Sequence, residues 1–142
     1  ERLAGYTEAL KEAGIGFDPQ LVKVGDYQIE SGITAAQALL MLKQRPTAIF
    51  CFNDEMAIGA MSFIQDLGYH IPNDISIIGF DDIRFAQFST PSLTTIRQPV
   101  EDIGSNCMNM LIDLMTGEGT KSDYIELPVT LVERNSTAPV RA

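Results

Sequence analysis

The sequence predicts an α/β fold built on a doubly wound parallel sheet, and three observations support this prediction. Short apolar runs rich in β-branched residues, at 21–24, 47–52 and 75–80, are typical of strands buried on both faces of a sheet. Helical patterns alternate with these runs, as expected of repeated β-α-β units. Polar residues follow each run and would share the carboxyl edge of the sheet, where open α/β sheets bind ligands.

The individual elements follow from apolar spacing and from capping residues. Four helices are predicted, at 2–13, 34–43, 55–67 and 100–115. Gly14 and Gly68 lie where the first and third helices should end, because glycine readily adopts the left-handed conformation of a C-terminal cap. Asn53 or Asp54 is the predicted N-cap of the third helix. Further short strands are expected at 93–96, 124–127 and 129–132.

The composition excludes several classes of protein. The chain has 142 residues, of which 45% are hydrophobic and 20% are charged, as in a single globular domain. Its net charge of −9 and its scattered basic residues make it a poor binder of nucleic acid by itself, because phosphate contacts need clustered Lys and Arg. No apolar run has the length of a membrane span, and neither a secretory signal nor an initiator Met opens the chain. We therefore expect a piece of a longer protein.

Signatures of enzymes and metal sites are weak or missing. Cys51 and Cys107 lack the spacing of a metal site and are expected to be buried free thiols. His70, the only histidine, lies in a predicted loop, and no phosphate-binding loop or nucleophile elbow is present. Asp81 and Asp82 are neighbours in sequence whose side chains need not face each other. The sequence thus predicts no catalytic residue, no metal and no cofactor.

Three predicted strand ends place candidate binding residues on one edge of the sheet. Tyr27 follows the first strand, Asn53 the second and Asp81 the third. An aromatic ring can stack on a sugar or nucleobase, and amide and carboxylate groups can hydrogen-bond to hydroxyls or N–H groups. An anionic ligand would be repelled unless Arg2, or residues outside this chain, compensated the carboxylates.

Each candidate also has an ordinary structural interpretation. Asn53 can serve only as an N-cap, and Tyr27 can be a half-buried aromatic residue. Arg2 can pair with a surface carboxylate, and Asp82 is expected to stabilise the following loop rather than to contact ligand. Asp81 is the strongest candidate because it directly follows a buried strand.

Five motifs, in order and in register, resemble the effector-binding core of the lactose/galactose-repressor family. They read RLAGYTEAL, GDYQIESG, PTAIFCFNDEMAIGAM, GYHIPNDISIIGFDD and TPSLTTIRQP. The similarity runs from Arg2 to about Thr137 and is closest to the purine-repressor and cytidine-repressor branch. It implies a periplasmic-binding-protein-like fold of type I, of which this chain would be mainly a truncated second lobe.

The resemblance implies an effector-binding role for five residues that match the family motifs: Arg2, Tyr27, Asn53, Asp81 and Gln98. Arg2 would reach into the cleft, Tyr27 would stack on the ligand, and Asn53 and Asp81 would hydrogen-bond to it. Gln98 lies at the crossing between lobes, where some members contact ligand. Tyr27 stands where some relatives have Trp or Phe, so the ligand preference of this chain is expected to differ from theirs. Dimer contacts are implied for Ile58, Phe85, Phe88 and Ser89.

The resemblance also divides the chain between two lobes. Residues 1–98 would form the C-terminal lobe, 99–126 would cross to the N-terminal lobe, and 127–142 would return. Most of the first lobe and the N-terminal helix-turn-helix domain lie outside this chain. The apolar face of the predicted helix at 100–115 should therefore lack its partner and dock on a neighbouring molecule; its residues are Ile103, Met110, Leu111 and Leu114.

The expected function is effector sensing and dimerisation in a cytoplasmic bacterial transcriptional repressor. A nucleoside, nucleobase or sugar would control DNA binding allosterically, and DNA would be contacted only through the missing domain. The alternative is a solute-binding protein of a sugar or nucleoside transport system, which would need a secretion signal. A hydrolase on the same sheet would need a nucleophile–base pair that the sequence does not show.

Overall fold

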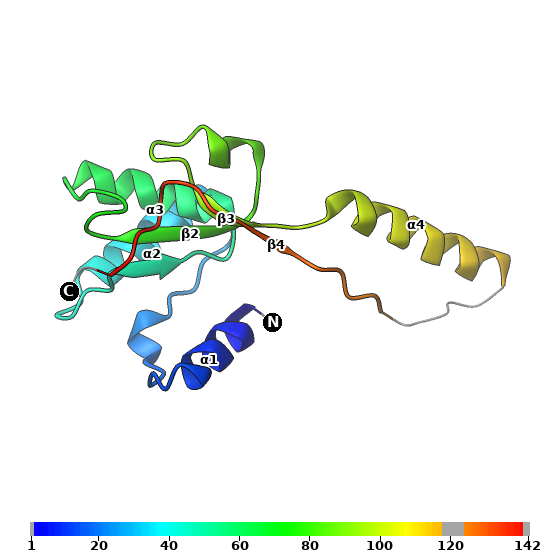
Figure 1. Ribbon diagram of the computed structural model, residues 1–142, viewed down its shortest axis with the longest axis horizontal. Coiled ribbons are helices and arrows are strands. Elements are labelled where there is room, and N and C mark those ends of the chain that lie inside the picture. Colours follow the sequence, from blue (N-terminus) through cyan, green and yellow to red (C-terminus); the bar gives the residue numbers. More distant parts are fainter. Residues whose placement is uncertain (1, 118–123, 141–142) are drawn as a thin grey trace.

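The computed structural model describes residues 2–117 and 124–140, and one sheet organises them (Figure 1). The strand order is β1-β2-β3-β4, with bounds Ala48–Phe50, Ser76–Asp81, Thr94–Arg97 and Thr130–Val132. β1, β2 and β3 are parallel, whereas β4 pairs antiparallel with β3. The predicted α/β class with a mainly parallel sheet is confirmed, and the antiparallel β4 makes the sheet mixed.

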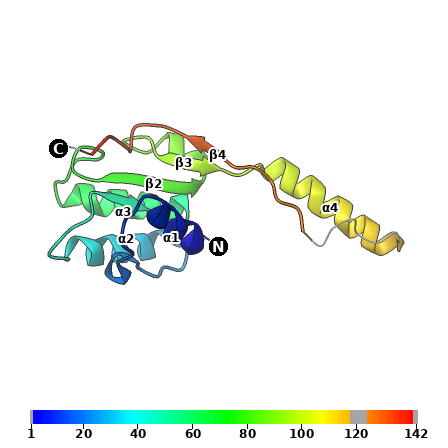
Figure 2. The same ribbon diagram turned by 60° about the horizontal axis from the view of Figure 1, so that its bottom comes forward.

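The helices of the described residues are α1 (Arg2–Glu12), α2 (Ile29–Leu40), α3 (Asp54–Asp66) and α4 (Val100–Thr116). α2 and α3 pack against each other, and α3 lies directly on β2 (Figure 2). α2 begins earlier than predicted because Gly32 does not break it. At Gly32 the two helices approach so closely that an added Cβ would lie 2.1 Å from the carbonyl oxygen of Met56. None of these helices is long and apolar enough to cross a membrane.

The hydrophobic core lies between the sheet and the α2–α3 pair. Its buried members come mainly from α2, α3, β1 and β2, and they include Ala36, Leu39, Ile49, Met56, Ala57, Ala60, Met61, Ile64 and Ile77. Ile64 and Ile77 are completely buried. Burial of one such aliphatic side chain contributes about 1.5–3 kcal/mol, so this layer dominates the stability of the sheet–helix unit.

Two predicted strands are wrong. Residues 21–24 belong to no strand, because Asp18 caps a 3₁₀ turn at Pro19–Leu21 and the extended chain that follows has no partner strand beside it. The carboxylate of Asp18 accepts from the backbone N–H of Gln20 at 2.8 Å and stabilises that turn. Residues 124–127 also form no strand, because their neighbour β3 ends at Arg97, opposite Thr130.

α4 stands away from the sheet and carries no buried residue (Figures 1 and 2). On its expected apolar face, Leu111 and Leu114 are 50% and 62% exposed. This position also corrects the prediction for the thiols. Cys51 is buried in the core, but Cys107 lies on α4 and is exposed.

The contact at Gly32 gives a test of the α2–α3 packing. We expect Gly32→Ala to lower the free energy of unfolding by about 1–3 kcal/mol, because its methyl group would overpack the backbone of α3. Urea unfolding measures the change. Gly104→Ala in α4 is the matched control, since an added Cβ there would meet nothing within 4 Å apart from its chain neighbours and the backbone of its own helix. It should leave stability unchanged or raise it by up to about 1 kcal/mol. Equal losses for the two variants would contradict the packing argument.

Candidate functional site

The carboxyl end of β2 holds two consecutive acidic residues in an unusual backbone conformation. The φ angles of Asp81 and Asp82 are 114° and 54°, in the left-handed region that favours glycine. Each such residue costs about 1–3 kcal/mol, so contacts with the surrounding structure must hold it there. The contacts of both carboxylates, and of the backbone that follows them, identify the elements that do so.

Asp81 lies against Gln98 and Arg2. The Nε2 of Gln98 donates to Oδ1 of Asp81 at 2.6 Å, and an Arg2 guanidinium nitrogen lies 3.7 Å from the same oxygen. The Arg2 guanidinium also sits over the Phe80 ring, 4.2 Å from its centroid. Gln98 reaches Asp81 because Arg97, its neighbour, pairs with Asp81 across β2 and β3. The structure therefore brings three of the five predicted effector residues together, in a cluster that is partly open to solvent.

Asn53 and Tyr27 form a second group, at the starts of α3 and α2. Oδ1 of Asn53 accepts from the backbone N–H of Met56 at 2.9 Å, so its N-cap role is confirmed. Its Nδ2 donates to the backbone carbonyl of Tyr27 at 2.8 Å. Tyr27 itself has φ 71°, and its side chain is exposed rather than half-buried. Asn53 thus fixes the backbone that presents this aromatic ring.

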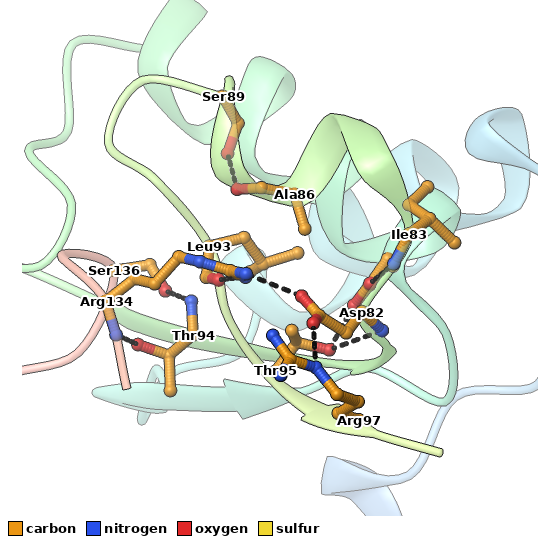
Figure 3. Close-up of polar contacts among 11 residues, drawn as sticks. Asp82, Ile83, Ala86, Ser89, Leu93, Thr94, Thr95, Arg97, Arg134 and Ser136 are labelled. Atoms are coloured by element: carbon orange, nitrogen blue, oxygen red, sulfur yellow. Dashed lines mark hydrogen bonds and ion pairs between the residues drawn. The ribbon is translucent and has the colours of Figure 1, made fainter. Parts of the chain in front are cut away.

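Asp82 is an ion-pair centre inside the structure. It accepts from Nε of Arg97 and from a terminal guanidinium nitrogen of Arg134, each at 2.6 Å (Figure 3). Burial raises the pKa of Asp82, but the hydrogen bonds and charges of Arg134 and Arg97 outweigh that effect and hold the pKa below its ordinary value. The carboxylate of Asp82 thus joins β2 to β3 and to the segment after β4, rather than to the loop that follows it, which was its expected partner.

Arg134 and Ser136 join the last described segment to the sheet (Figure 3). The guanidinium of Arg134 also donates to the carbonyl of Leu93 at 2.7 Å. The buried hydroxyl of Ser136 accepts from the backbone N–H of Thr94 at 2.8 Å and donates to the carbonyl of Ile77 at 2.6 Å. These contacts fix the segment after β4 against the sheet that carries the acidic edge.

Asp54 is a functional candidate that the sequence analysis missed. The sequence placed Asp54 at the same strand end as Asn53, as a polar residue of the edge and an alternative N-cap, but Asn53 takes the cap and Asp54 is completely buried. Oδ1 accepts from the hydroxyl of Thr95 at 2.6 Å, and Oδ2 accepts from the backbone N–H of Ile83 at 2.8 Å. Desolvation raises the pKa of Asp54, although these two hydrogen bonds oppose the shift. Among the described residues, no His, Cys, Asp and Glu side chains are grouped as a metal site.

The predicted dimer residues divide into two kinds. Phe85 and Phe88, in and beside the 3₁₀ turn Arg84–Gln87, are 69% and 66% exposed. Ile58 is partly buried against the core. The hydroxyl of Ser89 donates locally to the carbonyls of Ala86 and Pro91, at 3.0 and 2.9 Å. The two phenylalanine rings are therefore the side chains that a partner surface can reach.

The fold agrees with a comparison with known domains. Residues 1–137 match the family described as the periplasmic binding protein-like domain. The chain belongs to this family. The expectation drawn from the motifs is confirmed.

Similar proteins narrow the type of domain. Over 137 residues the chain is 46% identical to the HTH-type transcriptional repressor PurR of Erwinia tasmaniensis. The aligned region covers 96% of this chain and 40% of that protein. The solved complex of the transcriptional regulator CelR with cellobiose has a TM-score of 0.91 at 35% identity, covering 96% of this chain and 42% of that one. The structure of a LacI-type transcription regulator from Bifidobacterium animalis has a TM-score of 0.90 at 34% identity. The match covers 97% of this chain and 50% of that one. The chain is thus similar to a large part of the effector-binding domain of LacI-family transcriptional regulators. It spans under half the length of the curated relatives.

The ion-pair centre predicts a pH-dependent loss of stability. We expect Asp82→Asn to lower the free energy of unfolding by about 1–3 kcal/mol at pH 7, because two charge-assisted hydrogen bonds, one of them partly buried, lose their charged acceptor. The folded pKa is depressed, so the carboxylate stabilises above its unfolded pKa of about 3.9 and loses this effect as pH falls further.

Urea unfolding at several pH values therefore should show the difference between wild type and Asp82→Asn shrinking below about pH 4. Asp66→Asn, at the exposed end of α3, is the control and should match wild type throughout. A difference for Asp82→Asn that persists unchanged into acid would contradict the ion-pair argument.

Proposed function

We propose that this chain is the effector-sensing and dimerisation part of a cytoplasmic bacterial transcriptional repressor. The observation that carries the proposal is the cluster of Arg2, Asp81 and Gln98 at the carboxyl edge of the sheet. Such edges are where open α/β sheets bind ligands. DNA would be contacted through a helix-turn-helix domain outside this chain, because a domain with a net charge of −9 is a poor partner for phosphates.

The chemistry of the cluster favours a small, neutral, polar effector. The Asp81 carboxylate accepts hydrogen bonds from ligand hydroxyl or N–H groups, and Arg2 balances part of its charge. The exposed Tyr27 ring suits stacking on a sugar or nucleobase face, with Asn53 beside it. Nucleosides, nucleobases and sugars share these features. The CelR relative in complex with cellobiose supports a sugar, whereas resemblance to the purine-repressor branch supports a nucleobase or nucleoside.

The position of Gln98 suggests how binding is transmitted. It lies between β3 and α4, at the point where the chain leaves the sheet, and it already contacts Asp81. In the proposal, residues 1–98 and 127–142 form one lobe, and 99–126 pack α4 by its apolar face against the other lobe. A ligand held by Asp81 and Gln98 then favours one lobe orientation to the extent that it binds that orientation more tightly.

Calorimetric titration of the intact protein tests this function. Cytidine, adenosine, hypoxanthine, guanine, ribose and cellobiose are the probe compounds, and one class should bind saturably. Asp81→Asn should weaken that binding by about 10- to 100-fold, because a hydrogen bond to a charged group is worth about 1.5–3 kcal/mol. Asp66→Asn, at the opposite end of α3, should bind as wild type does. If Asp81→Asn binds the compound with the affinity of the wild type, the binding site lies elsewhere.

The exposed phenylalanines predict the dimer surface. Buried aromatic anchors dominate interface energies, so Phe88→Asp should raise the dimer dissociation constant of the intact protein by about 30-fold or more, corresponding to at least about 2 kcal/mol. Sedimentation equilibrium measures this change. Met41→Asp is the matched control, since Met41 is an exposed apolar residue just after α2. If the Phe88→Asp protein dimerises as wild type does, the interface lies on another surface.

A further inference from the structure

We propose that Asp54 is the positioning residue of the effector site, because its carboxylate fixes the backbone at 81–83 that presents Asp81 to the ligand. This inference deepens the proposed function and rests on it, since it assigns Asp81 a role in binding. Asp54 itself is completely buried and would touch no ligand.

The two oxygens of Asp54 hold two different segments of the chain. Oδ1 accepts from the hydroxyl of Thr95 in β3, at 2.6 Å. Oδ2 accepts from the backbone N–H of Ile83, two residues after Asp81, at 2.8 Å. Asp54 comes from the first turn of α3, so one carboxylate connects this helix, the strand β3 and the loop after β2.

These contacts hold the left-handed turn from both of its ends. On the β2 side, the pairing of Asp81 with Arg97 fixes the backbone. On the loop side, the N–H of Ile83 is held by Asp54, and the N–H of Asp82 lies 3.4 Å from the Thr95 hydroxyl that donates to Asp54. The disfavoured φ angles of Asp81 and Asp82 thus persist because the chain on either side of them is fixed.

The packing around the carboxylate supports a dedicated role. An added Cβ at Gly79 would lie 2.1 Å from Oδ1 of Asp54, so the β2 backbone leaves room for this group and no more. The ion pairs formed among the described residues do not include Asp54. Asp54 lies instead in the first turn of α3, where the helix dipole favours a negative charge. Burying a carboxylate without a cationic partner costs free energy. In this site the buried carboxylate holds the loop in its observed conformation.

Asp54→Asn and Thr95→Val in the intact protein test the proposal, with Glu55→Gln as the control. Glu55 is the exposed neighbour of Asp54 on the same helical turn, so its variant removes one charge from that turn without touching the loop. Hydrogen exchange of the backbone amide of Ile83 should accelerate at least 10-fold in Asp54→Asn and in Thr95→Val, and it should not change in Glu55→Gln. Unchanged exchange at Ile83 would overturn the proposal. If Asp54→Asn fails to fold, hydrogen exchange of the Ile83 amide is measured in Thr95→Val alone.

Effector titration then separates positioning from general stability. Asp54→Asn should weaken binding of the probe compound at least 10-fold, but the double variant with Asp81→Asn should bind no more than twofold more weakly than Asp81→Asn alone. If the fold-losses in effector affinity of the two single variants instead multiply in the double variant, the proposal is overturned, because Asp54 would then not act through Asp81. If none of the probe compounds binds wild type, the proposed effector class fails, and the exchange of the Ile83 amide still decides whether Asp54 fixes the loop.

Discussion

Asp82 accepts hydrogen bonds from Arg97 and Arg134, and this interaction joins the end of β2 to the end of β3 and to the segment that follows β4. Arg97 precedes the segment that leaves for α4, and Arg134 follows the strand that returns from it. The two cationic groups sit on one carboxylate that is almost completely shielded from water, where charge-assisted hydrogen bonds are strongest. The neighbouring Asp81 therefore stays partly open to solvent while the chain on either side of it is fixed.

The three carboxylates of this edge illustrate how environment divides identical groups into different roles. Asp82 has two cationic partners that outweigh the cost of its burial, and its pKa is lowered. Asp54 has only neutral donors, and desolvation raises its pKa. Asp81 remains partly accessible, with an amide and a guanidinium on one oxygen. An acidic edge of this kind tolerates close carboxylates because each has its own set of donors.

Much of the fold could be predicted from the sequence, because local patterns determine it. The apolar runs around Ile49 and Ile77 became β1 and β2, and the polar Asn53 capped α3 as its position indicated. The prediction at residues 21–24 failed because a strand also needs a neighbour with which to pair, and apolar alternation does not report one.

The site could be predicted only in part, for a related reason. Asp81 was identifiable because it directly follows a buried run, and Gln98 and Arg2 followed from motifs. Asp54 and Arg134 act through partners about 30 to 50 positions away, so no local spacing marks them. The sequence contained only an indirect indication of Arg134. An acidic edge needs cationic or N–H donors, and the few arginines of the chain were the candidates for that role.

The contrast between the two cysteines has a practical consequence. Burial in the core, with Asp54 nearby, raises the pKa of the Cys51 thiol to about 12, so almost none of it is the reactive thiolate at neutral pH. Cys107 is exposed, on the helix that stands away from the sheet. A thiol-directed fluorophore would therefore label this chain at Cys107 and not at Cys51. That label would sit on α4, the helix that the proposal packs against a second lobe, so its fluorescence would report on that packing.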